Sequence, residues 1–385
     1  MNRAVKHRKN EPRILIVSVR GFRLHVANCG IYEFEDLICD LESAKLYAPT
    51  QEFDLARKIY RLAKYATGSD TIASALAPFP TEVVLENEYD LLFVVCDNPW
   101  QLHRLGAIKN WQDKCRHKAC YVMETWKLNF NDWRLAYEPF KNFDHIFAGT
   151  IHCVEPYSNV TGLPCSYLAP GVDTLKFCPY PNPPQRMIDV CAIGRRPAET
   201  HQSLFQYSQQ NNNFFYYYDT FNNPGKLEIG NPREHRAKLI DVLQRSRYNI
   251  AAHARFDATS ETGGQQEIGF RYFEGVAAGT VLVGMPPMGD VFPHYFDWED
   301  PIIKVNLFEQ DVLEVIQALN AQPETVERMR RRNVANSLRK HDWVYRWRDI
   351  LATFNLAPSP AVIERENHLQ QLACRIESID MPVAC

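Results

Sequence analysis

The chain has 385 residues, of which 45% are hydrophobic, an ordinary globular composition with enough apolar material for two domain cores. A formal net charge of −3 does not favour nucleic acid or an anionic membrane as the main partner. No apolar run approaches the roughly 18 residues of a membrane-spanning helix, and the basic start lacks the apolar stretch of a signal peptide. These features predict a cytoplasmic protein that is not transmembrane.

The cysteines do not form a recognisable metal motif. Cys115, His117 and Cys120 are spaced as C-x-H-x-x-C, but no fourth ligand stands nearby in the sequence. Other cysteines, such as Cys96 and Cys191, lie inside apolar runs, where buried free thiols are more common than disulfides. We therefore expect no metal site.

Strand and helix patterns alternate through the first half of the chain. A continuous apolar run predicts a strand over 13–19, and strand-like patterns appear over 89–97, 119–124 and 143–149; "CSYLAPGVD" (165–173) ends this half. Helical spacing appears over 51–66 and 99–114. The stretch "FCPYPNPPQ" (177–185) holds four prolines in nine residues, which excludes both a helix and a central strand and predicts a linker.

The alternation restarts after the linker. Strands are predicted over 188–194, 214–219, 248–254, 281–285 and 301–306, and helices over 199–209, 233–246, a segment starting at 267–270, and most of 310–356. Such alternation in both halves predicts an α/β protein with two doubly wound, Rossmann-like domains. Ligands bind beyond the carboxyl ends of the strands in such sheets, so a cleft between the two domains is expected.

The stretch "ETGGQQEIGFRYFEGVAAGTVLVG" (261–284) combines a glycine loop, a helix and a buried strand. A glycine loop that feeds a helix N-terminus suits a phosphate, because backbone N–H groups and the helix dipole meet there. Glu274 is placed to accept two hydrogen bonds from a vicinal diol, as on a ribose. In the plainer alternative, Glu267 caps the helix dipole and Glu274 forms a salt bridge. "AAGTVLVG" is interpreted as close helix–strand packing followed by a buried strand.

Three segments together resemble a known family. "APGVDTLKFCP" (169–179), "IGRR" (193–196) and "FRYFEGVAAGTVLVG" (270–284) resemble the group-1 family of nucleotide-sugar glycosyltransferases with the GT-B fold. Within it, the R-x-F-E-x-x-A-x-G pattern is similar to a bacterial branch, and "HDWVYRWRDIL" (341–351) resembles that branch's C-terminal helix. The resemblance covers 165–351, whereas residues 1–150 match only in their strand–helix rhythm.

The resemblance implies a domain division. Residues 1–180 would form an acceptor-side Rossmann-like domain, and residues 181–340 a Rossmann-like domain that binds the nucleotide-sugar donor. Residues 341–385 would be C-terminal helices that cross back to the first domain.

The resemblance also implies roles in donor binding. Glu274 would hold the nucleotide ribose, and Arg195 would neutralise the pyrophosphate, with Arg196 as its rival. The donor phosphates would be met by backbone N–H groups of Gly264, Gly269, Phe270, Arg271 and Tyr272. Fixed cations and amides stabilise a leaving diphosphate without a metal. One departure is that Gln266 occupies the family's first acidic position, so either Glu267 takes that role through a local shift or this branch does without it.

The N-terminal half should supply the acceptor site. Gly21 follows the first strand and would let the backbone approach the donor phosphates. His25, Asp97 and Glu124 follow predicted strands and are candidates for acceptor contact or general base. For each of them a structural role is the alternative.

The leading hypothesis is a glycosyltransferase of carbohydrate biosynthesis that uses a nucleotide-diphosphate sugar such as a UDP- or GDP-sugar. The acceptor is unidentified: a glycan, a lipid or a small molecule. By resemblance we expect retention of configuration, no metal and no cofactor beyond the co-substrate. The alternatives are a GT-B nucleotide-sugar epimerase and a catalytically silent GT-B binding protein or subunit. Helix-prone residues 359–385 either pack on the first domain or form a homo-oligomer contact.

Overall fold

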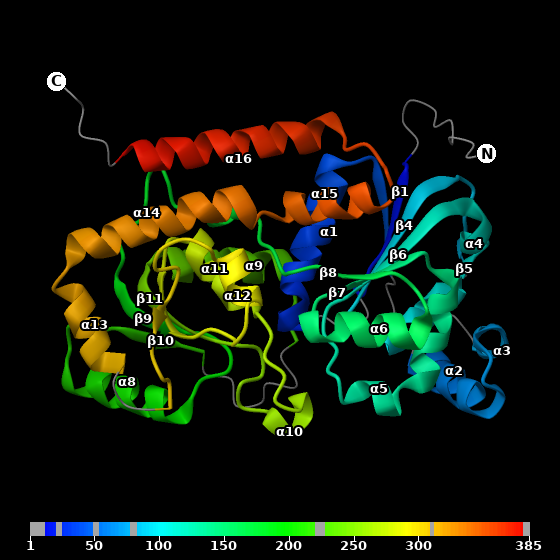
Figure 1. Cartoon of the computed structure of the whole chain (residues 1–385), viewed down its shortest axis with the longest axis horizontal. Helices are drawn as coiled ribbons and strands as arrows, with labels where there is room; N and C mark the ends of the chain where they lie inside the picture. The colour runs from blue at the N-terminus through cyan, green and yellow to red at the C-terminus, as the bar shows by residue number, and fades with distance from the viewer. Residues whose placement is uncertain are drawn as a thin grey trace.

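Two all-parallel β-sheets form the cores of two domains (Figure 1). The structure is a computed structural model that describes residues 12–20, 25–48, 54–77, 83–219, 228–308 and 312–379. The N-terminal sheet has the order β2-β1-β4-β6-β7-β8. Its strands are β1 (Ile14–Val17), β2 (Ala44–Tyr47), β4 (Tyr89–Cys96), β6 (Cys115–Val122), β7 (His145–Ala148) and β8 (Cys165–Tyr167). The predicted α/β class with doubly wound parallel sheets is confirmed.

The central strands of this sheet are apolar on both faces. All four residues of β1, "ILIV", are buried, as expected where helices cover both sides of a parallel sheet. The helices of this domain are α1 (Cys29–Leu41), α2 (Asp54–Thr67), α3 (Asp70–Leu76), α4 (Trp111–Lys114), α5 (Asn129–Asp132) and α6 (Val154–Thr161), with 3₁₀ helices η1 (Val26–Asn28), η2 (Pro99–Ala107), η3 (Arg134–Asn142) and η4 (Ile151–Cys153).

The helix predicted over 99–114 is wrong in its extent. The segment forms η2, then the short strand β5 (Ile108–Lys109), then α4. Asn110 turns the chain between them with φ at 55°, and its side chain bonds to both the N–H and the carbonyl of Leu85, each at 3.0 Å. These bonds align β5 beside β3 (Val83–Val84), which local helical spacing does not reveal.

The C-terminal sheet has the order β10-β9-β11-β12-β13. Its strands are β9 (Ile188–Ala192), β10 (Tyr216–Tyr218), β11 (Ser246–Ala252), β12 (Val281–Met285) and β13 (Ile303–Lys304). Its helices are α8 (Ala198–Gln210), α9 (Pro232–Gln244), α10 (Thr259–Thr262), α11 (Phe270–Ala277), α12 (Val291–Tyr295), α13 (Val312–Asn320) and α14 (Pro323–Lys340). The proline-rich stretch lies between α7 (Thr174–Phe177) and β9 and joins the two sheets.

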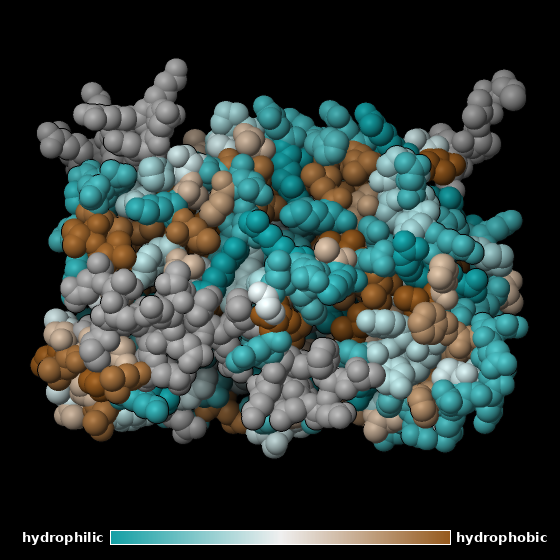
Figure 2. Space-filling view, turned by 180° about the vertical axis from the view of Figure 1, so that it is seen from behind, coloured by the Kyte–Doolittle hydropathy of each residue, from teal (hydrophilic) through white to brown (hydrophobic). Residues whose placement is uncertain are grey.

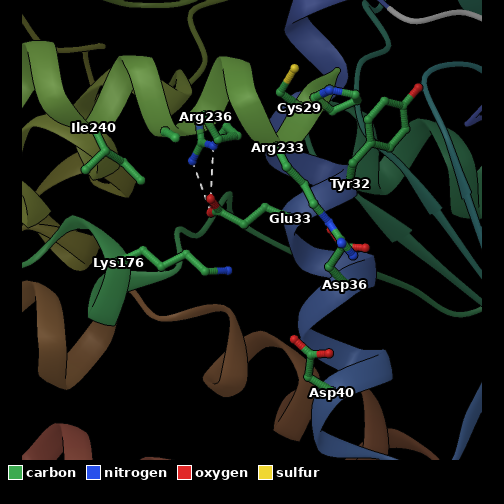
Figure 3. A pocket seen from close by; sticks show the side chains of 11 residues that line it. Cys29, Tyr32, Glu33, Asp36, Asp40, Lys176, Arg233, Arg236 and Ile240 are labelled. Atoms are coloured by element: carbon green, nitrogen blue, oxygen red, sulfur yellow. Dashed lines mark hydrogen bonds and ion pairs between the residues drawn. The ribbon is translucent and has the colours of Figure 1, made fainter. Parts of the chain in front are cut away.

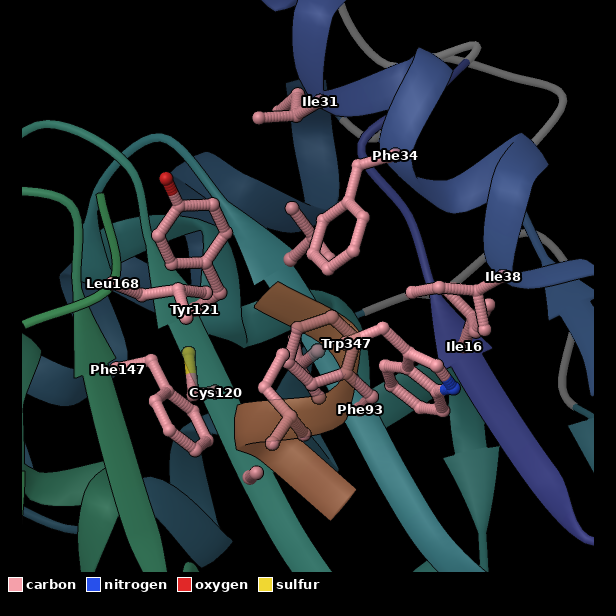
Figure 4. Close-up of a cluster of buried hydrophobic side chains, with 14 of the residues drawn as sticks. Ile16, Ile31, Phe34, Ile38, Phe93, Cys120, Tyr121, Phe147, Leu168 and Trp347 are labelled. Atoms are coloured by element: carbon pink, nitrogen blue, oxygen red, sulfur yellow. The ribbon is translucent and has the colours of Figure 1, made fainter. Parts of the chain in front are cut away.

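Two C-terminal helices pack on the N-terminal domain. α15 (Trp343–Thr353) and α16 (Pro360–Ser378) bring Trp343, Trp347 and Leu369 into the apolar core around β1 and β4. Figure 4 shows Trp347 beside Phe93 of β4 in this core. Phe34 of α1 stacks on Trp343 with ring centres 4.5 Å apart. In Figure 1, α16 runs alongside α14, so these helices lie along both domains.

The interdomain passage is bound to the start of α15. Backbone bonds link Val172 to His341 and to Trp343, at 3.0 and 3.2 Å. Arg346 donates to the carbonyls of Ala169 and Pro170. In the described part of the chain, no helix is both long enough and apolar enough to cross a membrane.

Candidate functional site

A glycine-containing loop leads from β11 into α11. Gly263 and Gly264 have φ of 63° and 77°, a left-handed conformation that glycine adopts without strain. Gly269 is the N-cap of α11, and no side chain of the described residues caps this helix end. Because the first N–H groups of a helix lack acceptors within the helix, this end at the carboxyl edge of the sheet suits an anion.

Small residues seat α11 closely on β12. A Cβ added to Gly275 would overlap the Leu282 side chain, so glycine at this position favours the close approach of helix and strand. All but the last residue of β12 are buried. The interpretation of "AAGTVLVG" as packing followed by a buried strand is confirmed.

Glu274 lies buried between two arginines. Its side chain is 2% exposed; one oxygen accepts from Arg236, and the other accepts from Nη1 of Arg271 at 2.5 Å. Burial alone would raise the pKa of Glu274, but the charges of Arg271 and Arg236 outweigh burial and lower it. The carboxylate is therefore held in its charged form, which is the better hydrogen-bond acceptor.

Arg236 connects Glu274 to the other domain. Its Nε and Nη2 atoms each lie 3.0 Å from an oxygen of Glu33 on α1, while its Nη1 atom binds Glu274. Burial disfavours the charge of Arg236, but the two carboxylates outweigh it and raise the pKa. Glu33 also accepts from the backbone of Asp173 at 2.8 Å. The row Glu33–Arg236–Glu274 thus joins α1, α9 and α11.

A cavity of about 420 Å³ opens beside this row, between α1 and α9. Figure 3 shows Glu33 and Arg236 facing each other at the cavity, with Lys176 reaching toward it from α7. At its more exposed side, Arg233 pairs with Asp36 at 3.0 Å. The cavity wall therefore carries both signs of charge.

Glu267 lies ahead of α11 rather than on it, so the two glutamates do not share a helix face. Its carboxylate accepts from the backbone N–H groups of Ile151 and His152, at 2.9 and 3.2 Å, and from Nδ1 of His152 at 2.8 Å. Gln265 donates to it as well, at 2.7 Å. Glu267 is 3% exposed and holds the start of η4 in the N-terminal domain.

Arg195 and Arg196 follow β9 and have different surroundings. Arg195 is 38% exposed and pairs with the equally exposed Asp257 at 2.7 Å. Arg196 is more buried, binds Asp219 and lies over the ring of Tyr218. The Arg195 side chain is therefore the less constrained of the two.

The three candidates of the N-terminal domain, His25, Asp97 and Glu124, bind different partners. His25 caps η1 by accepting from Ala27 N at 3.2 Å, and it forms a backbone bridge with Glu228. One oxygen of Asp97 accepts from Asn28 and Gln101, whereas its Oδ1 is buried without a hydrogen-bond partner among the described residues.

Glu124 is bound by a residue of the other domain. Nε of Arg255 lies 2.7 Å from its carboxylate, and Trp126 donates to the same oxygen at 3.0 Å. Arg255 itself has φ at 49°, which is strained for a residue other than glycine and is typical of functional positions.

The remaining predicted residues lie along the same edge, except Gly21, which is outside the described residues. A Cβ added to Gly264 would meet no atom within 4 Å. Phe270 packs on α1 so closely that a Cβ on Gly30 would lie 2.5 Å from its ring. Tyr272 is buried and donates to the carbonyl of Met285 at 2.5 Å.

Sequence reasoning did not single out Glu33, Arg236 or Arg255. A signal for Glu33 exists, because "CGIYEFEDLICDL" places Glu33 and Glu35 inside an otherwise apolar helix, and buried carboxylates need partners. Arg236 and Arg255 carry no such signal, since their partners lie 203 and 131 positions away in the chain.

Comparisons with known proteins agree on the fold. Residues 216–352 match the sequence profile of a family described as "Glycosyl transferase-like". The structure resembles Anabaena HepE in complex with UDP and glucose, with a TM-score of 0.51 and 10% identity, covering 89% of this chain and 99% of HepE. It also resembles a glycosyltransferase from Rickettsia africae, with a TM-score of 0.50 and 10% identity, covering 90% and 98%.

The comparison with curated proteins found no match. At these identities the structural likeness speaks for the fold alone, while the profile match runs from β10 through most of α15. The chain therefore has the two-domain GT-B fold, and its C-terminal domain is similar to the glycosyl transferase-like family.

Proposed function

We propose that the protein is a glycosyltransferase that takes its sugar from a nucleotide-diphosphate donor. The observation that carries the proposal is the ionised Glu274, held between two arginines on a helix whose N-terminus opens at the carboxyl edge of the sheet. The family match of residues 216–352 supports the same conclusion. HepE, which has a similar fold, is known in complex with UDP-glucose.

Arg195 is the better supported partner for the donor diphosphate. Its ion pair with Asp257 is exposed on both sides, and such pairs contribute roughly 0–1 kcal/mol. A diphosphate carries more charge than one carboxylate, so it displaces Asp257 at little cost. Arg196 is held by Asp219 and Tyr218, and we assign it to positioning the loop after β9.

Glu274 is proposed to accept hydrogen bonds from the donor ribose. A carboxylate has about four acceptor sites, so the two arginines leave capacity for a diol. Because Glu274 is 2% exposed, the ribose reaches it only after Arg271, which is 27% exposed, moves or the domains part. Arg236 then keeps the carboxylate in place.

In the reaction, the bond between the sugar's anomeric carbon and the diphosphate oxygen breaks, and the nucleoside diphosphate leaves with the electron pair. The acceptor oxygen forms the new bond to the sugar and loses its proton. The N-terminus of α11 and Arg195 would stabilise the charge on the leaving diphosphate, which is why we expect no metal requirement. By family resemblance we propose retention of configuration.

Glu267 is proposed to be structural. Both of its oxygens are used by residues 151 and 152, so it has little capacity for a donor sugar. Gln266, in the family's first acidic position, accepts from Met288 N at 2.9 Å through its carbonyl oxygen and keeps its amide N–H groups for a ligand. The donor-sugar contact in this branch would then be an amide.

The test is a thermal-shift panel of UDP, GDP and their sugars on the purified protein. A donor that binds the folded state raises the melting temperature, by an amount that grows with the logarithm of its concentration relative to its Kd. The donors found are then incubated with and without candidate acceptors. Transfer supports the proposal, whereas a changed sugar without any acceptor would assign an epimerase. If no nucleotide shifts the melting temperature, the proposal is wrong.

A further inference from the structure

The helical hairpin of α2 and α3 exposes a cluster of large apolar side chains. Leu62 is 73% exposed, Leu55 65%, Tyr65 59%, Leu76 58% and Ile72 47%. Figure 2 shows apolar side chains gathered at the corner of the N-terminal domain where Figure 1 places these two helices. Exposed apolar patches of this kind mark interaction surfaces.

The exposed residues form stripes that the hairpin does not use for its own packing. Leu55, Leu62 and Tyr65 are separated by seven and three residues, so they share one face of α2. Opposite faces of the two helices meet through a small buried cluster of Ala56, Tyr60, Ala63, Ala73 and Ala77. The apolar stripes are therefore left for a partner.

Cations stand among the apolar residues. Lys58 and Arg61 are exposed on α2. Apart from the buried Lys64, which is paired with Glu138, residues 54–77 contain three lysines and arginines against two aspartates, a local charge of +1 in a chain whose net charge is −3. A helix with a leucine and tyrosine face beside lysine and arginine is suited to the interface of an anionic bilayer. A protein partner of this hairpin would instead need carboxylates spaced to match it.

The hairpin is fixed at the carboxyl edge of the N-terminal sheet. Lys64 is fully buried and pairs with Glu138 at 2.6 Å, which anchors α2 to η3. Arg61 lies 4.7 Å from the ring of Trp100, at the start of η2, directly after β4 and Asp97. A surface bound by α2 and α3 would therefore lie on the same side as the N-terminal part of the candidate site.

We propose that the α2–α3 face docks on an anionic membrane surface. The side chains of Leu55, Leu62, Tyr65, Ile72 and Leu76 enter the interface, while Lys58 and Arg61 meet lipid phosphates. The proposal goes beyond the proposed function and does not depend on it, because docking needs no donor and no reaction.

The experiment is co-sedimentation of the full chain with vesicles of equal parts phosphatidylcholine and phosphatidylglycerol. We expect binding that weakens with salt, and a loss of at least about tenfold in the partition coefficient for the double variant Leu62→Ser/Leu76→Ser. Lys58→Glu should weaken binding to the anionic vesicles only. Met187→Ser, which alters a side chain that is 59% exposed in the other domain, is the matched control and should bind like the natural chain.

Three results would overturn the proposal. The chain stays in the supernatant, or the double variant sediments as well as the natural chain, or vesicles of phosphatidylcholine alone bind equally well. A dimer in solution that the double variant dissociates would assign the face to a second copy of the chain instead. Because all of these changes are at exposed positions, circular dichroism melting should show folded variants in every case.

Discussion

Glu33 and Arg236 join the two domains through a bidentate ion pair. Nε and Nη2 of Arg236 lie 3.0 Å from the two oxygens of Glu33, and both side chains are less than 10% exposed. The same guanidinium binds Glu274, which we propose holds the donor ribose. Domain contact and donor recognition therefore share one buried arginine.

Removal of this pair should cost substantial stability. In Glu33→Gln, Arg236 keeps only Glu274 as a carboxylate partner, and breaking a buried pair costs about 3–5 kcal/mol. We expect a fall of that order in the free energy of unfolding by urea. Arg233→Ala is the matched control, because Arg233 on the same helix pairs with Asp36 but is 77% exposed. The free energy of unfolding of Arg233→Ala should fall by less than about 1 kcal/mol. Equal falls in Arg233→Ala and Glu33→Gln would contradict the assignment of Glu33 and Arg236 as a stabilising buried pair.

Substitutions of Arg195 and Arg196 should have different effects on nucleotide binding. Arg195→Ala should weaken binding of a nucleoside diphosphate about tenfold or more, because a charge-assisted contact is lost. The same variant should bind the parent nucleoside unchanged. Arg196→Ala should lower the melting temperature more than Arg195→Ala does, since it frees Asp219 and Tyr218. Isothermal titration with the diphosphate and with the nucleoside measures these affinities. If Arg196→Ala weakens diphosphate binding more than Arg195→Ala does, the roles assigned to the two arginines are exchanged.

Asp97 is the best supported candidate for the general base. Its buried Oδ1 has no hydrogen-bond partner in the described part of the chain, whereas Glu124 is bound by Arg255. Asp97→Asn should lower kcat by about 10²–10⁴ and leave the donor Kd unchanged. If kcat is unaffected, Asp97 only orders Asn28 and Gln101, and the proton leaves by another route.

His341 should make stability depend on pH. It is fully buried among Phe273, Phe296 and Trp298, and burial lowers its pKa below the ordinary value of 6.5. Below pH 6.5 the unfolded chain therefore binds a proton at His341 that the folded chain does not bind. The free energy of unfolding should fall by about 1.4 kcal/mol per pH unit in this range.

The comparison that isolates His341 is the difference between the natural chain and His341→Phe in urea unfolding at several pH values. The His341→Phe variant should lack the fall in unfolding free energy below pH 6.5 that protonation of His341 causes. His368→Phe, at an exposed position, should keep it. Identical slopes for the natural chain and His341→Phe would show that burial of His341 is not the cause.

The sequence was sufficient for the α/β class and for the helix that carries Glu274. β1 is an unbroken apolar run, as is β4 from Leu91 to Cys96, and the step from Gly275 to Val283 predicts close packing and a buried strand. These features are local, so a single sequence contains them.

The partners of the site residues could not be predicted. The sequence does not predict α1, or Glu33 within it, because Gly21 and His25 after β1 favour a loop there. The sequence offered Glu267 as a cap of the helix dipole, yet it lies before α11 and holds residues 151 and 152 of the other domain. Contacts between residues more than 100 positions apart depend on how two domains meet, which periodicity does not encode.

The central claim is that Glu274 recognises the donor nucleotide. Isothermal titration of UDP and GDP should compare the natural chain with Glu274→Gln, which keeps the shape and removes the charge. We expect micromolar binding of one nucleotide and a loss of about 10–100-fold in the variant. Glu33→Gln, which disturbs Arg236 but spares Glu274, should lose much less. Equal affinity in Glu274→Gln, or an equal loss in Glu33→Gln, would contradict the account.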